Sequence, residues 1–179
     1  MDFQIVKFIN NFGHGTRVDI FSQYISLNRV MITIRALVII LTVILKRKYW
    51  KFVLFSFVLA GALFYGVSEI GFKTILVQET GIRPRPYIAY SELIQPIGKH
   101  YNDSSFPSSH MVLTVAMITV LIILFPAMRP YAILYVLLMA WSRMYNGMHY
   151  PSDILVGTFF GILCGRVAVI LSKRVFVLK

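Results

Sequence analysis

The stretch SRMYNGMHYPSD, from Ser142 to Asp153, places a guanidinium, an imidazole and a carboxylate at short, defined spacings. Arg143 offers a planar fork of donors that suits phosphate oxygens. Pro151 is typical of a first helical turn, so the sequence predicts His149 just before a helix and Asp153 within it. We expect Asp153 to accept a hydrogen bond from one nitrogen of His149, which leaves the other nitrogen unprotonated and nucleophilic.

Long apolar runs surround this stretch and predict an all-α, polytopic membrane helix bundle. Hydrophobic residues make up 58% of the 179 residues and charged residues only 14%, whereas a soluble domain carries about 25% charged residues. We expect about five transmembrane helices, from the runs at 30–45, 52–68, 111–125, 131–141 and 154–171. The third and fourth runs reach spanning length only with their polar flanks.

Polar residues modify two of these runs. The first run can extend back toward Phe21, and Arg35 within it is expected to snorkel to the interface. The second run continues through Glu69 and Lys73 as a helical extension.

Residues 1–28 are expected to form an interfacial segment with a short amphipathic helix, because Phe3, Ile5 and Phe8 are interspersed with polar residues. A break is predicted at residues 13–15, which read Gly-His-Gly. The segment lacks the basic start and long apolar centre of a cleavable signal, so we expect it in the mature protein. Residues 1–179 should form a single domain, with 29–179 as the transmembrane bundle.

The basic residues predict how the chain is oriented. The 18 Lys and Arg residues outnumber the 7 Asp and Glu, but they interrupt membrane-length runs and form no single basic face. The bilayer is therefore the expected partner, and nucleic acid is not. Eight basic residues belong to one side, which the positive-inside rule places in the cytoplasm: Lys46, Arg47, Lys48, Lys51, Arg129, Lys173, Arg174 and Lys179. The loop at 80–107 and the turn at 142–153 then share the opposite face.

A second polar group, Pro107-Ser108-Ser109-His110, precedes the third apolar run. Small polar residues there are typical of a helix cap, and alone they would indicate nothing more. A helix start also presents backbone N–H groups and the positive end of its dipole to an anion. His110 is placed to deliver a proton to a leaving oxygen.

Further cations are expected on the same face. Lys73, Arg83 and Arg85 would each be interpreted as an interface anchor if taken alone, but together with the two motifs they indicate an anionic substrate. His110, His149 and Asp153 have ligand types that suit zinc. The surrounding cations would repel a metal, so no metal and no cofactor is expected.

These motifs resemble those of the type 2 phosphatidic acid phosphatase (PAP2) superfamily, which are K-x6-R-P, P-S-G-H and S-R-x5-H-x3-D. The third motif is matched in full, and the second with Ser109 in place of Gly. The first departs in spacing, because Lys73 precedes Arg83 by ten positions and Arg85 by twelve, where the family has seven. Arg85, which is followed by Pro86, matches the family arginine.

The resemblance implies a PAP2-like core and a lipid phosphatase that works through a phosphohistidine. His149 would attack phosphorus, Asp153 would orient His149, and His110 would protonate the leaving oxygen and then activate water. Phosphoryl transfer needs mainly positioning and charge neutralisation, which cations can supply without a metal. The expected phosphate-binding residues are Lys73, Arg83, Arg85, Ser108, Ser109 and Arg143.

The resemblance leaves several substrates open. Family members of this size act on phosphatidylglycerol phosphate, phosphatidic acid, undecaprenyl diphosphate or lipid A 1-phosphate. We favour a bacterial cell-envelope enzyme of the inner membrane whose active site faces the periplasm or exterior. The alternative is a non-enzymatic transporter of lipids or anions, which would use the same cations but would not need His149 beside Asp153. A haloperoxidase would need a soluble body, which this sequence lacks.

Overall fold

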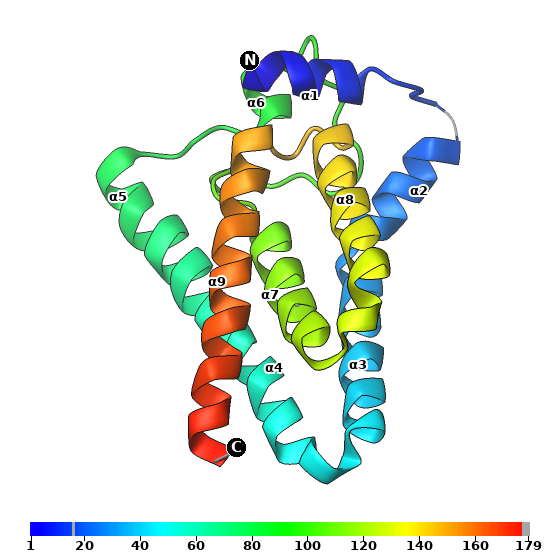
Figure 1. Cartoon of the computed structure of the whole chain (residues 1–179). Coiled ribbons are helices and arrows are strands. Elements are labelled where there is room, and N and C mark those ends of the chain that lie inside the picture. Colours follow the sequence, from blue (N-terminus) through cyan, green and yellow to red (C-terminus); the bar gives the residue numbers. More distant parts are fainter. Residues whose placement is uncertain (16, 177–179) are drawn as a thin grey trace.

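The computed structural model describes residues 1–15 and 17–176, so the predicted basic residue Lys179 lies outside the described part. Every regular element within these residues is helical. Five helical segments form the bundle: α3 (Asn28–Leu45), α4 (Trp50–Phe64) with its continuation, α7 (Ser109–Leu124), α8 (Arg129–Tyr145) and α9 (Pro151–Phe176). Figure 1 shows them side by side beneath a layer of short helices and loops, which confirms the predicted all-α class.

The second bundle segment is one long helical run with a widened stretch in its upper half. The turn η1 (Arg47–Tyr49) leads into α4, which continues as the π-helix η2 (Tyr65–Leu76) and then as α5 (Val77–Thr80). The predicted helical extension through Glu69 and Lys73 is confirmed, and both side chains lie in the π-helical part.

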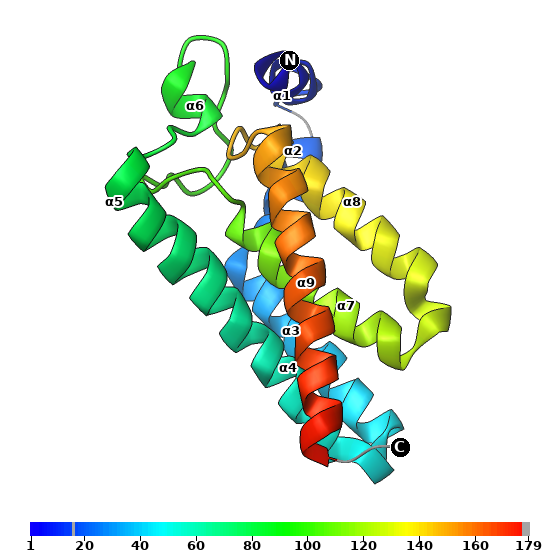
Figure 2. The same ribbon diagram turned by 60° about the vertical axis from the view of Figure 1, so that its left-hand side comes forward.

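Length and hydropathy qualify three helices as membrane spans: Asn28–Leu45, Arg47–Thr80 and Pro151–Phe176. The apolar helix α7 has 16 residues and is shorter than a full span. Figures 1 and 2 show that α7 begins deeper in the bundle than the upper ends of α8 and α9. The chain that enters α7 therefore dips into the bundle before this helix begins.

The predicted N-terminal amphipathic helix is two helices, α1 (Asp2–Asn10) and α2 (Arg17–Ser26), separated at the expected break. Helix α1 lies across the upper end of the bundle (Figure 1) and buries Val6 against Ile94 and Tyr150. The amide of Asn10 donates to the backbone oxygens of Gln95 and Tyr145 at 2.9 and 2.7 Å. The apolar face of α1 thus packs partly on protein, which its sequence pattern alone could not distinguish from lipid.

The first span begins at Asn28, so the predicted extension back toward Phe21 is wrong: the chain leaves helical geometry at Leu27, and Phe21 belongs to α2. Arg35 consequently lies two turns inside α3. Its guanidinium does not snorkel but donates from Nη2 to Thr114 Oγ1 on α7 at 3.2 Å. The Thr114 hydroxyl accepts a hydrogen bond from the guanidinium inside the bundle, so the Arg35 side chain does not extend to the interface.

Helices α7 and α9 pack at close range through a stripe of glycines on α9. A Cβ built on Gly161 would lie 2.7 Å from the Val112 carbonyl oxygen, and one on Gly165 would lie 2.6 Å from the Ala116 oxygen. Glycines spaced by four residues allow two membrane helices to approach this closely. The contact fixes the start of α7 relative to the start of α9, and these are the two helix starts that carry the motifs.

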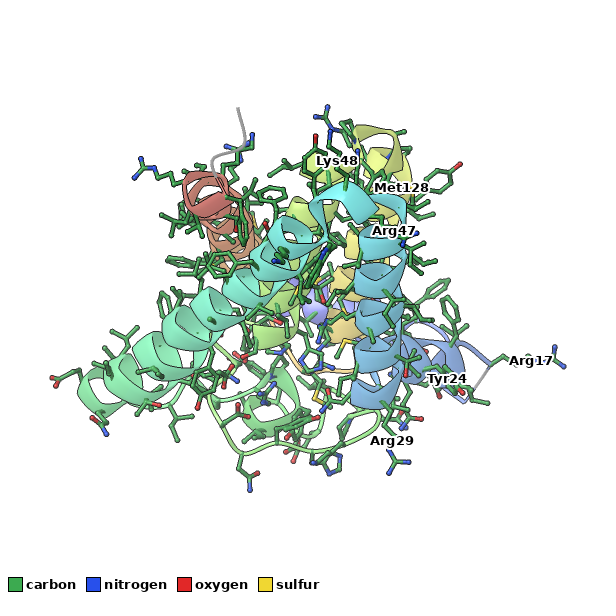
Figure 3. The ribbon with its side chains drawn as sticks, turned by 90° about the horizontal axis from the view of Figure 1, so that it is seen from below. Arg17, Tyr24, Arg29, Arg47, Lys48 and Met128 are labelled. Carbon is green, nitrogen blue, oxygen red and sulfur yellow. The ribbon has the colours of Figure 1, made fainter. Side chains whose placement is uncertain are left out.

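The basic turns gather at the lower end of the molecule. Figure 3, viewed from below, shows Arg47 and Lys48 in the turn between α3 and α4, with Met128 of the next turn nearby. Lys46 Nζ lies 4.9 Å from the ring centroid of Phe125, which links the two turns. Phe176 contacts Phe55 with ring centroids 5.7 Å apart, so the lower end of α9 lies there too. The predicted arrangement, with basic turns at one end and motif-bearing loops at the other, is confirmed.

Candidate active site

The three motif-bearing segments meet at a cavity of about 120 Å³ near the upper end of the bundle. Pockets that enclose whole small molecules measure roughly 300–1,000 Å³, so this cavity suits a headgroup phosphate and not an entire lipid. Its lining comes from the upper part of η2, the loop before α7, the first turn of α7, the end of α8 and the turn before α9. The lining residues are Glu69, Lys73, Arg85, Tyr101, Asp103, Ser109, His110, Arg143 and His149.

The position of His149 follows from a tight turn between α8 and α9. Gly147 adopts a positive φ of 70°, and a Cβ there would lie 2.8 Å from Ile94 Cγ2, so the turn requires glycine. Two residues later the His149 ring is buried, with Nδ1 2.8 Å from the backbone oxygen of Ser105. Because a carbonyl can only accept, Nδ1 carries the proton and Nε2 presents its lone pair.

His149 is neutral at physiological pH. Burial lowers its pKa well below the ordinary imidazole value, and the positive charges of Arg143 and Arg85 lower it further. Nε2 accepts a hydrogen bond from Arg85 Nη1 at 3.3 Å. The nitrogen that faces the cavity is thus an unprotonated base held at a fixed position.

Asp153 does not make the hydrogen bond to His149 that the sequence predicts. Its Oδ2 lies 3.7 Å from Nδ1 of the ring and accepts instead from the backbone N–H of Tyr150 at 2.8 Å. Oδ1 accepts from Arg83 Nη1 at 2.5 Å. The carboxylate is occupied at the start of α9, so the Ser105 carbonyl takes the position that we expected for Asp153.

Arg83 is not one of the residues that line the cavity, contrary to the prediction that it binds phosphate. It donates from Nη1 to Asp153 and Ser152, and from Nη2 to Asp2 of α1 at 3.1 Å. Residues two apart in an extended chain share a face, so backbone alternation does not separate Arg83 from Arg85. Anchoring by the two carboxylates draws Arg83 toward the start of α9, away from the cavity.

Lys73 and Arg85 both reach the cavity, so the long spacing between them in the sequence does not separate them in space. Each donates to the same carboxylate: Lys73 Nζ to Asp103 Oδ2 at 2.6 Å, and Arg85 Nη2 to Asp103 Oδ1 at 2.7 Å. Arg85 is further held by a bond from Nη1 to the Met148 carbonyl at 3.1 Å.

Arg143 and His110 contribute unpaired donors to the cavity. Arg143 is buried near the end of α8, and its Nε has no hydrogen-bond partner among the described residues. His110 Nε2 is likewise buried and unpartnered within that part of the chain. Buried polar atoms without partners are rare in proteins, and they indicate a site that a polar ligand completes.

The serines before α7 divide between two roles. Ser109 lines the cavity, and its hydroxyl donates to Glu69 Oε1 at 2.6 Å. Ser108 does not line the cavity and makes no side-chain cap; it is buried against α9, 3.6 Å from where a Cβ of Gly157 would lie. The Ser108 hydroxyl is buried and has no hydrogen-bond partner among the described residues, so its contact with a phosphate stays a prediction.

Asp103, Ser105 and Tyr101 belong to the site but were not among the predicted residues. They lie in a loop without helical or strand pattern, where only the approach to the Pro107 motif hints at their position. One feature of the sequence could have identified Asp103: it and Glu92 are the only acidic residues between positions 81 and 107. Within residues 1–15 and 17–176, no group of three His, Cys, Asp or Glu side chains could hold a metal ion.

Comparisons with known proteins agree with this geometry. The model of the PAP2 superfamily matches residues 70–176, a range that includes every predicted site residue. The chain is 30% identical over 117 residues to a lipid A 1-phosphatase of Rhizobium johnstonii, covering 63% of this chain and 47% of that protein. It is 25% identical over 169 residues to the undecaprenyl-diphosphatase BcrC of Bacillus subtilis, covering 92% and 81%.

The fold also matches a solved structure. The crystal structure of LpxE from Aquifex aeolicus superposes with a TM-score of 0.69 at 21% identity, covering 94% of each chain. The chain spans about half the length of the Rhizobium relative, so similarity alone does not assign that protein's activity to this chain. The match to the family model covers more than half of the sequence and every motif-bearing segment, and this integral multi-pass membrane protein belongs to the PAP2 superfamily.

Proposed function

We propose that the protein is a membrane lipid phosphatase that removes a terminal phosphate from a lipid headgroup through a phosphohistidine on His149. The observation that carries the proposal is the state of the His149 ring. Nδ1 is bound to a backbone carbonyl and Nε2 faces a cavity lined by Lys73, Arg85 and Arg143. A nucleophile aimed into a cationic cavity is what displacement at a phosphate requires.

The first step forms a bond between His149 Nε2 and phosphorus and breaks the bond from phosphorus to the lipid oxygen. The cations neutralise the charge that builds on the phosphate oxygens. His110 lines the cavity and, in the protonated form that exists once the anionic phosphate is bound, gives its proton to the departing oxygen. The Asp153 carboxylate, 3.7 Å from Nδ1, faces the positive charge that the His149 ring acquires.

The second step hydrolyses the phosphohistidine. Water attacks phosphorus while His110, now neutral, takes its proton, and the bond from phosphorus to Nε2 breaks. Orthophosphate leaves and both histidines return to their starting protonation states. Protons pass only between His110, the departing oxygen and water, and His149 keeps its proton on Nδ1, so the reaction balances without a further proton carrier.

The proposed site faces the periplasm or exterior of a bacterial inner membrane. The support is the charge distribution, since the basic turns lie at the end of the bundle opposite the cavity. Lipid A 1-phosphate and undecaprenyl diphosphate are the substrates that we favour, with phosphatidylglycerol phosphate and phosphatidic acid as the other candidates. In all four the tail can stay in the bilayer while the phosphate enters the cavity.

Phosphate release by the purified protein from a panel of these four lipids, with EDTA present, tests the proposal. We expect release from at least one lipid, unaffected by the chelator. His149→Ala should abolish release, with a loss of about a thousandfold or more. A transporter would instead keep its transport in proteoliposomes after this substitution. Glu92→Gln, at an exposed carboxylate of the same loop, is the matched control and should behave as the wild type.

A further inference from the structure

The cationic cavity already contains an anion that belongs to the protein. The two oxygens of the Asp103 carboxylate bind Lys73 Nζ and Arg85 Nη2 at 2.6 and 2.7 Å. A phosphate group would use two of its oxygens in the same way. Although burial alone would raise the pKa of Asp103, the hydrogen bonds from Lys73 and Arg85 lower it overall, so the carboxylate is ionised.

The charges around the cavity show what this carboxylate does. Three cations (Lys73, Arg85 and Arg143) and two carboxylates (Glu69 and Asp103) line the cavity, which leaves one excess positive charge. If Asp103 moves away, the excess becomes two. A phosphate monoester carries close to two negative charges at neutral pH, so the cavity matches it only once Asp103 has left.

The surroundings of Asp103 allow such an exchange. Its side chain is 45% exposed and lies on a loop, whereas the side chains of Arg85 and Lys73 are only 3% and 13% exposed. Arg85 is independently held by the Met148 carbonyl and by His149. The cations therefore belong to the packed wall, and the carboxylate is the partner nearest to solvent.

We propose that Asp103 is a resident competitor for the phosphate site, which an incoming anion must displace from Lys73 and Arg85 before it can bind. This inference rests on the proposed function, because it assigns the cavity to phosphate. The affinity of every anion is reduced by the fraction of molecules in which the site is open. Weakly bound anions are then excluded, while a phosphate monoester, which gains more from the cations, still binds.

The excluded anions are those that surround the site. Bulk membrane lipids carry phosphodiester headgroups with one negative charge, at concentrations far above that of any lipid phosphate. The product orthophosphate is a second competitor. A competing carboxylate lowers the occupancy of the site by both. Against the singly charged diesters, Asp103 sets the minimum charge that a ligand needs; against orthophosphate, whose charge is close to that of a monoester, it promotes release.

Binding of methyl phosphate and dimethyl phosphate to the full-length protein in detergent, measured by calorimetry, tests the inference. These probes carry about two and one negative charges at pH near 8. In Asp103→Asn we expect both to bind roughly tenfold more tightly than in the wild type. Asp103→Glu, which keeps the charge, should stay near the wild type, and so should the control Glu92→Gln. In mixed micelles, phosphatidylglycerol should compete with methyl phosphate more strongly in Asp103→Asn.

Equal or weaker binding of methyl phosphate by Asp103→Asn would overturn the inference, because Asp103 would then support the cations instead of competing. Absence of binding by both proteins would overturn it as well. A thermal melt of each variant identifies misfolding, and Asp103→Ser is a second neutral variant for that case. If Asp103→Asn binds methyl phosphate more tightly but no lipid in the panel is hydrolysed, the proposal that Asp103 competes for the site holds and the phosphatase proposal fails. If a lipid is hydrolysed but Asp103→Asn binds no more tightly, the phosphatase proposal stands and the competitor fails.

Discussion

The ring of His149 is held between two fixed groups, the Ser105 carbonyl at Nδ1 and the Arg85 guanidinium at Nε2. Neither contact was predicted from the sequence, where His149 and Asp153 are spaced as partners. A spacing of four residues brings two side chains near each other, but the third group that competes for them comes from a loop 44 residues away. Motif spacing thus placed His149 at the cavity and misassigned the group that hydrogen-bonds to its ring.

The lowered pKa of His149 predicts the acid side of the pH profile. In the proposed mechanism the neutral ring is the nucleophile, and an ordinary imidazole is half protonated at about pH 6.5. Because burial and then the charges of Arg143 and Arg85 lower the pKa of His149, the ring stays neutral below that pH. We expect the acid limb of kcat/KM to have its midpoint below about pH 6.5, measured from about pH 5 to pH 8. A midpoint at or above the ordinary value would contradict this placement of the ring.

Arg83 and Arg85 are a pair of adjacent cations with different expected roles. Arg85→Ala should raise KM and reduce kcat/KM by roughly a hundredfold, because a phosphate ligand is lost. Arg83→Ala should leave KM close to the wild-type value but lower kcat and the melting temperature, since it removes the partner of the buried Asp153. Removing the arginine leaves the buried Asp153 carboxylate without this partner. Because the Arg83 side chain is itself 35% exposed, we expect a loss of about 2 kcal/mol, less than for a fully buried pair.

Steady-state kinetics combined with a thermal melt distinguish the two arginines. A large rise in KM for Arg83→Ala, without a change in melting temperature, would show that Arg83 contacts the substrate after all. Asp2→Asn is a milder variant at the same network and should lower the melting temperature in the same direction.

At the scale of helices, the contact between α7 and α9 determines the distance between the two motif-bearing helix starts. The sequence shows glycines at 157, 161 and 165, and this spacing is typical of close helix packing in membranes. The glycine spacing does not identify the partner helix, because any of the other apolar runs could provide an apolar face that packs against these glycines. The five apolar runs predicted the five helical segments of the bundle, although only three of these qualify as membrane spans among the described residues, since burial in lipid or in protein needs the same residue types. The boundary at Leu27 was missed, because no Gly or Pro marks it.

Gly161→Ala should destabilise the bundle and impair the site together. The added Cβ would meet the Val112 oxygen and Val115 Cβ at 2.7 Å, and both belong to packed parts of α7. We expect a loss of about 1–3 kcal/mol from this overpacking, with reduced phosphate release as His110 shifts relative to His149. Gly66→Ala, at a position with open space around it, is the control and should be nearly neutral. Denaturant or thermal unfolding in detergent provides the measurement, and equal stability of the two variants would refute the packing argument.

At the scale of the whole molecule, the upper end carries the cavity and the lower end carries the basic turns. This polarity was predictable, because alternation of helices and the positions of Lys and Arg need no tertiary information. The position of α1 was not predictable. Whether α1 faces lipid or protein depends on the loop beneath it, and the path of that loop has no periodic signal in the sequence.

The sidedness predicts different accessibility for two introduced cysteines. The sequence contains one cysteine, Cys164, which is buried and should remain unlabelled. In intact cells a membrane-impermeant maleimide should label Glu92→Cys, at an exposed position of the loop before α7, and should reach Lys48→Cys only after permeabilisation. Labelling in the opposite order would place the site in the cytoplasm and remove the periplasmic substrates from consideration.

The contacts of α1 have a consequence for biosynthesis. This helix is synthesised before its partners Gln95, Tyr145 and Ser152, which emerge from the ribosome much later. Each of these partners lies in or beside a segment that carries part of the site. Packing of α1 on these partners is therefore complete only after α9 has entered the membrane. A nascent chain stalled before that point has not yet placed Met148 and His149, which hold Arg85, so the proposed hydrolytic competence arises in a single late event of assembly.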